Sequence, residues 1–107
     1  MSITHPPLQL TREHQQLVQG ILDQVLPGIA VLVFGSRATG RARRYSDLDL
    51  VLLGNAPLPL AVMADLREAF DQSDLPFPVD VVEWCRLSPD MQAVIARDGA
   101  PLPPLSP

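Results

Sequence analysis

The sequence predicts an α+β fold, in which helices pack on a small mixed β-sheet. Three short segments with the pattern of strands lie between longer segments whose apolar residues repeat at helical spacing. Of the 107 residues, 47% are hydrophobic and 19% are charged, so the chain can bury a core. This length also predicts one domain over residues 1–107, because a domain takes roughly 100–200 residues.

The first half of the chain predicts a helix followed by two strands. Thr11 is a typical N-cap, and apolar residues then recur at helical spacing up to Leu26, where proline and glycine end the helix. Residues 29–34 form a continuous apolar run that is typical of a strand buried on both faces. Residues 37–46 are polar and basic and predict a loop, and residues 47–53 predict the second strand.

The second half predicts a helix, a strand and a last helix. Apolar residues recur at helical spacing from Leu60 to Phe70, and residues 79–84 predict the third strand. The last helix begins at Ser88-Pro89 and ends at Gly99, with its apolar face on Met91, Val94 and Ile95. We expect residues 1–10 and the proline-rich residues 100–107 to be peripheral, because proline is excluded from helix and sheet interiors.

Composition excludes several classes of function. The net charge of −4 argues against direct binding of a nucleic-acid backbone. All eight Lys and Arg positions are arginine, which excludes chemistry that requires lysine, and the single Cys85 excludes a disulfide within the chain. We expect a cytoplasmic protein without membrane contact, because its apolar runs reach only about six residues, against the roughly 20 that a bilayer requires. His5 and His14 are expected to be exposed to solvent.

Asp47 and Asp49 are the first candidate functional residues. They are two positions apart on a predicted strand, so both side chains leave the same face. Like charges on one face repel each other, and carboxylate oxygens of this kind bind divalent cations such as Mg²⁺. Taken alone, such a pair is more often the end of a strand whose acids point into water.

The residues before the acidic pair favour a ligand site. A buried strand ends in Gly35-Ser36, where glycine allows close approach of a ligand and the serine hydroxyl can hold phosphate oxygens. Half of the arginines lie between this turn and the acids, at Arg37, Arg41, Arg43 and Arg44. A positive patch suits phosphate binding beside a metal, although a solvated loop explains each arginine taken singly.

Asp80 is the third candidate carboxylate. It is the only charge within the apolar part of the third strand, where a lone carboxylate is costly unless it is paired or bound to a metal. Glu83 is three positions away and points to the opposite face, so we assign it to solvent or a partner. The alternative is an edge strand on which Asp80 is simply exposed.

The combined pattern resembles the DNA polymerase β-type nucleotidyltransferase superfamily, which carries Gly-Ser, ten residues, Asp-x-Asp and a third aspartate on a later strand. The Gly-Ser-Arg-Ala-x-Gly opening and the Ser-Asp-Leu-Asp-Leu ending resemble its minimal nucleotidyltransferases, which are commonly paired with a HEPN-domain protein. The resemblance runs from about Leu17 to Gly99. It implies the nucleotidyltransferase fold, ATP as the substrate and Mg²⁺ as the cofactor, with two ions expected.

The resemblance also implies a role for each residue. Gly35 and Ser36 would hold the triphosphate, and Arg37 would add a phosphate contact. Asp47 and Asp49 would bind both metal ions. Asp80 would complete one of these metal sites and take the proton of the attacking hydroxyl. In the toxin–antitoxin members, AMP is transferred to a tyrosine of the HEPN ribonuclease, which silences it.

Two other functions stay open at this point. One is a nucleotidyltransferase for a small molecule such as an aminoglycoside, although such enzymes usually hold the acceptor with a second domain. The other is a non-catalytic antitoxin that binds and blocks its partner. In both antitoxin interpretations the partner is a HEPN toxin in a hetero-oligomer. Its basic surface would meet acids that otherwise form a solvated helix face, namely Asp65, Glu68, Asp71 and Asp74.

Overall fold

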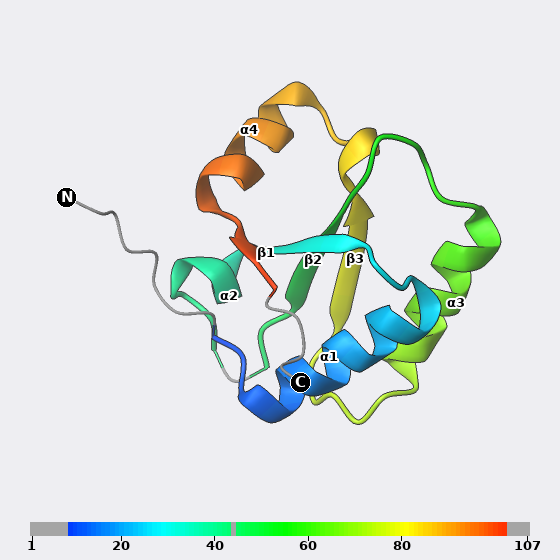
Figure 1. The fold of residues 1–107 in the computed structure, drawn as a ribbon. Coiled ribbons are helices and arrows are strands. Elements are labelled where there is room, and N and C mark those ends of the chain that lie inside the picture. The colour runs from blue at the N-terminus through cyan, green and yellow to red at the C-terminus, as the bar shows by residue number, and fades with distance from the viewer. Residues whose placement is uncertain (1–8, 44, 103–107) are drawn as a thin grey trace.

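The computed structural model describes residues 9–43 and 45–102, which form a four-stranded mixed sheet with helices on both sides (Figure 1). The strands are β1 (Ala30–Phe34), β2 (Leu48–Leu53), β3 (Val79–Glu83) and β4 (Ala100–Pro101), in the order β3-β2-β1-β4. β1 is antiparallel to β2 and β4, whereas β2 and β3 are parallel. This confirms the predicted α+β fold with a small mixed sheet.

The helices are α1 (Arg12–Val25), α2 (Ser36–Thr39), α3 (Leu60–Asp71) and α4 (Pro89–Asp98), with a short 3₁₀ helix, η1, over Trp84–Arg86. Thr11 and Ser88 cap α1 and α4 as predicted, since their hydroxyls accept N–H hydrogen bonds from the first turns. The sequence did not predict α2, because a single turn leaves no apolar periodicity. No helix in the described part of the chain is long and apolar enough to span a bilayer.

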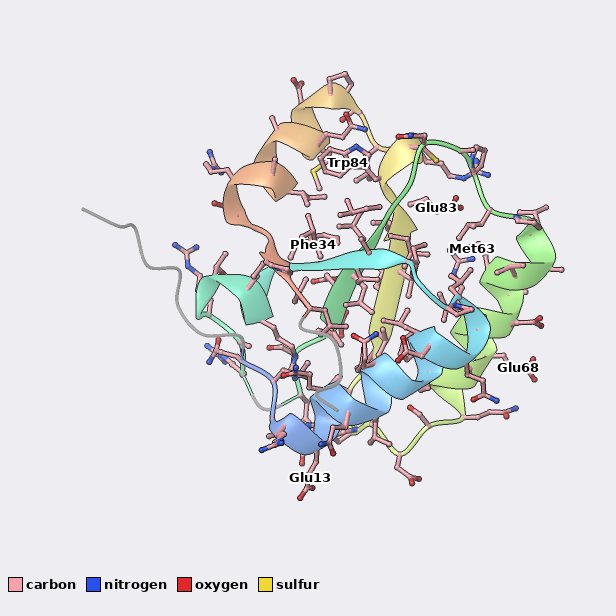
Figure 2. The ribbon with its side chains drawn as sticks, in the orientation of Figure 1. Glu13, Phe34, Met63, Glu68, Glu83 and Trp84 are labelled. Atoms are coloured by element: carbon pink, nitrogen blue, oxygen red, sulfur yellow. The ribbon has the colours of Figure 1, made fainter. Side chains whose placement is uncertain are left out.

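One face of the sheet carries the main core. Alternate strand residues on this face are buried, and α1 and α3 pack over them: Val31, Val33, Leu48, Leu50, Leu52 and Val81 from the strands, Val18 and Leu22 from α1, and Met63, Leu66 and Phe70 from α3. Figure 2 shows Met63 turned from α3 toward the sheet, with Glu13 and Glu68 on the outside. The opposite face carries Phe34 and Asp49 and lies toward α4 (Figure 1).

The ends of the described chain pack more closely than we predicted. Ala100 and Pro101 form the edge strand β4 rather than a peripheral segment, and the N–H of the buried Leu102 donates to the Val31 carbonyl. An edge strand accepts proline because one side of its backbone needs no donor. Residues 1–8 and 103–107, which complete the segments expected to be peripheral, lie outside the described residues.

Leu50 offers a direct test of where the core lies, because it pairs with Val33 and Val81 and is fully buried. Leu50→Ala leaves a cavity and should lower the free energy of unfolding by about 2–5 kcal/mol, measured by urea unfolding. The matched control is Leu60→Ala on α3, where the side chain is 82% exposed. The control should change stability by less than about 0.5 kcal/mol, and equal losses in both variants would contradict this core.

Candidate active site

Two of the predicted carboxylates lie side by side on neighbouring strands. Asp49 of β2 pairs in register with Asp80 of the parallel strand β3, so both side chains leave the same face of the sheet. Asp49 is half-buried, and Asp80 is exposed on an edge strand. Asp80 is therefore exposed on an edge strand, which is the alternative that its sequence left open. Its pairing with Asp49 nevertheless brings the two carboxylates together, as a shared site requires.

Asp47 completes the group from just outside the sheet, since β2 begins at Leu48 and not at Asp47 as predicted. Burial raises the pKa of Asp49 above its ordinary value, and the negative charges of Asp80 and Asp47 raise it further. The carboxylates of Asp80 and Asp47 therefore each repel that of Asp49 through space. Among the described residues, no three acidic, histidine or cysteine side chains form a ready-made metal cluster. The donor set still fits a hard cation, whose charge would relieve this repulsion.

Gly35 lies against Asp49 at the end of β1, where Phe34 pairs with Asp49. Its φ of 74° and ψ of −153° belong to a region that only glycine readily adopts. A Cβ at this position would collide with a carboxylate oxygen of Asp49 and lie 3.3 Å from its Cγ. Both the backbone conformation and the available space therefore require glycine at this position. The Gly-Ser turn thus lies next to Asp49, as the motif predicts.

The turn opens on a cavity of about 390 Å³ between α2 and α4. Gly35 and Ser36 line one side, and Met91 and Val94 of α4 line the other. Of the predicted apolar face of this helix, Ile95 is buried, whereas Met91 and Val94 are 41% and 42% exposed. The cavity lies within the range of small-molecule sites, roughly 300–1,000 Å³.

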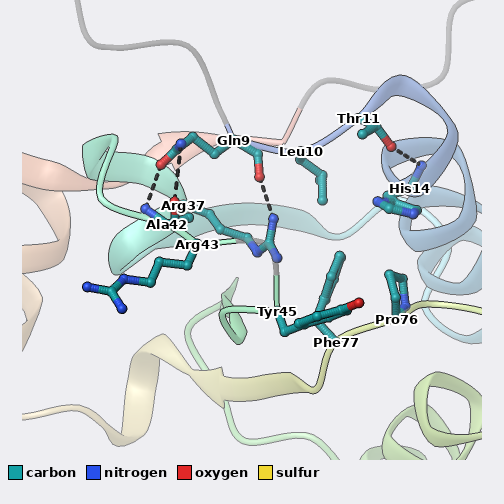
Figure 3. Close-up of a pocket in the computed structure, with 10 residues that line it drawn as sticks. All are labelled: Gln9, Leu10, Thr11, His14, Arg37, Ala42, Arg43, Tyr45, Pro76 and Phe77. Atoms are coloured by element: carbon teal, nitrogen blue, oxygen red, sulfur yellow. Dashed lines mark hydrogen bonds between the residues drawn. The ribbon is translucent and has the colours of Figure 1, made fainter.

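Arg37 lies elsewhere, buried with 5% of its surface exposed. Nε and Nη2 donate to the Ser46 carbonyl at 3.1 and 2.8 Å, and Nη1 donates to the Gln9 carbonyl at 2.6 Å. The guanidinium carbon lies 4.0 Å from the centre of the Phe77 ring (Figure 3), and burial lowers the pKa of Arg37. This placement contradicts the predicted phosphate contact, because backbone carbonyls engage the guanidinium.

Arg37 also lines a second cavity, of about 540 Å³, together with His14, Tyr45 and Phe77 (Figure 3). The prediction that His14 is exposed is wrong, because its ring is half-buried and meets the Phe77 ring edge-on at 5.4 Å. His5 lies outside the described residues. No local pattern in the sequence indicates this cavity, because its residues come from three separate segments: the start of α1 and the residues before it, α2 and the loop that follows it, and the segment before β3.

The remaining loop arginines divide between the two cavities. Arg41 is exposed and lines the cavity beside Ser36, whereas Arg43 is exposed and lines the cavity beside Tyr45. Arg44 lies outside the described residues. Of the predicted positive patch, Arg41 is therefore the described member that borders the same cavity as the Gly-Ser turn.

Glu83 points to the face opposite Asp80, as strand alternation predicts, but it is buried and not left to solvent or a partner. Its carboxylate accepts hydrogen bonds from the Leu58 N–H at 2.8 Å and from Arg86 Nε at 3.1 Å. Figure 2 shows it at the end of β3. Glu83 therefore fastens the segment before α3 to the end of this strand, on the opposite side of the sheet from Asp49.

Comparison with known proteins identifies the family of the chain. The nucleotidyltransferase domain family matches residues 15–102. The chain is 40% identical over 90 residues to the probable protein adenylyltransferase MntA of Haemophilus influenzae, covering 84% of this chain and 79% of that protein. The chain belongs to the nucleotidyltransferase domain family. Members of this family act on a nucleotide and usually use a divalent metal.

Solved structures confirm the nucleotidyltransferase fold. A chain of a toxin–antitoxin complex with AMP-PNP is 23% identical and has a TM-score of 0.69, covering 85% of this chain and 73% of that chain. A chain of the complex between the tri-AMPylated Shewanella oneidensis HEPN toxin and the MNT antitoxin is 22% identical, with a TM-score of 0.58 and the same coverage. At these identities the likeness establishes the fold.

The raised pKa of Asp49 predicts a dependence of stability on pH. The folded state favours the protonated carboxyl, so the contribution of Asp49 to stability is fully present below the ordinary pKa of 3.8 and is lost as pH rises through the raised value. In EDTA at pH 7, Asp49→Asn should therefore melt at or above the wild-type temperature, and the gain should shrink as pH falls toward 4. Asp65→Asn on the exposed face of α3 is the matched control. A lower Tm of Asp49→Asn at pH 7 would contradict the repulsion.

Proposed function

We propose that this chain transfers AMP from ATP to a tyrosine hydroxyl of a HEPN ribonuclease toxin, and so acts as its antitoxin. The observation that carries the proposal is the pairing of Asp49 with Asp80 beside a turn that requires glycine at Gly35. The relative named as a probable protein adenylyltransferase supports AMP transfer to a protein. The solved neighbours named as toxin–antitoxin complexes motivate the choice of partner.

Asp47, Asp49 and Asp80 would hold the divalent metal, for which we propose two Mg²⁺ ions. Their carboxylates are the ligands that this cation prefers, and burial followed by repulsion from Asp80 and Asp47 raises the pKa of Asp49 in the absence of a cation. When bound, the metal neutralises phosphate charge and lowers the pKa of the attacking hydroxyl. A bound cation would offset the electrostatic cost of placing Asp80 and Asp47 near Asp49.

The other residues bind and orient the reactants. Gly35 lets the backbone approach the triphosphate, and the Ser36 hydroxyl donates to its oxygens. The tyrosine oxygen attacks the α-phosphorus in line, so its new bond to phosphorus forms as the bond to the β-phosphate oxygen breaks and pyrophosphate leaves. Asp80, exposed on the edge strand, takes the tyrosine proton. Positioning and charge neutralisation supply most of the rate.

The proposal extends to the assembly and the compartment. Residues 1–107 form one nucleotidyltransferase domain, supported by a single continuous sheet within the family match over residues 15–102. The chain works in the cytoplasm as a hetero-oligomer with the toxin, and the lone Cys85 suits a reducing compartment. Acids on and after α3 are exposed and available to a basic partner surface: Asp65, Glu68, Asp71 and Asp74.

A transfer assay with a HEPN-domain toxin and radiolabelled ATP tests this function. Asp80→Asn should lower the rate of labelling by about 100-fold or more, because it removes both a proton acceptor and a charged metal ligand. Asp47→Asn combined with Asp49→Asn should abolish labelling while the circular dichroism spectrum is kept. Labelling by the double variant at the wild-type rate would refute the assignment of the acids.

Glu83→Gln is the matched control for Asp80→Asn, since it makes the same kind of change on the other face of β3. It should leave the rate of labelling near the wild-type value. It should lower Tm, because the neutral amide is a weaker acceptor for Leu58 and Arg86. A larger loss of transfer in Glu83→Gln than in Asp80→Asn would mean that the faces of β3 are assigned the wrong way round.

A further inference from the structure

Arg37 connects the two halves of the candidate active site from within the molecule. Its backbone lies in α2, one residue after Ser36, and its guanidinium reaches the carbonyl of Ser46, one residue before Asp47. Two donors, Nε at 3.1 Å and Nη2 at 2.8 Å, meet this one oxygen, and Nη1 meets the Gln9 carbonyl. A planar guanidinium that donates in two directions fixes both the position and the orientation of the segments it joins.

Burial gives these hydrogen bonds their importance. Arg37 is 5% exposed and rests against the face of the Phe77 ring. A charge at this depth is unfavourable unless it is hydrogen-bonded, so the guanidinium cannot leave its carbonyl acceptors for solvent without a penalty. The Arg37 side chain therefore stays in one position and holds the Ser46 carbonyl there.

The position of Asp47 depends on the hydrogen bonds of Arg37 more than the position of Asp49 does. Asp49 lies within β2, where ladders to β1 and β3 hold it on both sides. Asp47 lies in irregular chain before the strand begins. On its C-terminal side the Leu48 N–H donates to the Pro78 carbonyl at 2.9 Å, and on its N-terminal side the guanidinium holds the preceding carbonyl.

We propose that Arg37 is a positioning residue for Asp47. By holding the Ser46 carbonyl, it sets where the Asp47 carboxylate stands relative to Asp49 and Asp80, and it acts without touching the substrate. The inference rests on the proposed function, because Asp47 needs this placement only if the acids bind a metal together with the nucleotide. This role also explains why position 37 is an arginine, because lysine has no planar pair of donors that could meet one carbonyl.

Arg37→Lys tests the proposal, because it keeps the charge and loses the paired donors. The measurement is the affinity of the protein for Mn²⁺ in the presence of α,β-methylene-ATP, followed by electron paramagnetic resonance. Because residues that orient a metal ligand affect binding strongly, we expect a loss of about tenfold. Arg12→Lys, at an exposed arginine of α1, is the matched control and should bind as wild type. Wild-type affinity in folded Arg37→Lys would overturn the proposal.

A double-mutant cycle separates positioning of Asp47 from a general structural effect. In the Asp47→Asn background, Arg37→Lys should weaken Mn²⁺ binding by less than about twofold more, because the group that it positions is already lost. Equal losses in the two backgrounds would overturn the proposal while leaving the metal site intact. If Asp49→Asn binds Mn²⁺ as well as wild type, the proposed metal site itself is wrong, so the two failures are distinguishable.

The native protein provides the test if Arg37→Lys does not fold. In protein labelled with ¹⁵N-arginine, Mg²⁺ with α,β-methylene-ATP should shift the Nε–H resonance of Arg37, because its acceptor carbonyl adjoins Asp47. The Arg12 resonance should stay in place. An unmoved Arg37 resonance in protein that binds the metal would overturn the proposal.

Discussion

The register of β1, β2 and β3 is the constraint on which the candidate site depends. Phe34, Asp49 and Asp80 stand in one row across β1, β2 and β3, with Gly35 directly after the first of them. A slip of β2 by one residue would turn Asp49 toward the apolar layer under α1 and α3 and turn Leu50 away from it. Burial of the leucines on one face therefore fixes the carboxylates on the other, and the core that stabilises the fold also positions the chemistry.

The site combines rigid and less rigid parts. Asp49 and Asp80 are held by strand ladders, and the Gly35 carbonyl accepts hydrogen bonds from the N–H groups of Ala38 and Thr39. Asp47 lies outside the strand, so the sheet does not fix its position. The hydrogen bonds from Arg37 to the carbonyl of Ser46, the residue before Asp47, hold the chain there instead. Burial raises the pKa of Asp49, and repulsion by Asp80 and Asp47 raises it further, so a bound cation would both complete the site and remove an unfavourable interaction.

The sequence predicted the features that depend on local pattern, and missed those that depend on distant partners. Strand alternation placed Asp80 and Glu83 on opposite faces, but it could not show that Glu83 is buried, because its donors come from before α3 and from η1. The side chain of Arg37 was assigned to phosphate from its place in the motif. Its acceptors, the carbonyls of Ser46 and Gln9, come from segments that meet only in the folded chain.

The most direct test of the proposed active site is a crystal structure of the protein with Mn²⁺ and α,β-methylene-ATP, with anomalous scattering used to locate the metal. We expect a manganese peak in contact with the carboxylates of Asp49 and Asp80, and the triphosphate on Gly35 and Ser36. A nucleotide in the cavity beside Tyr45, with no manganese at Asp49, would contradict it.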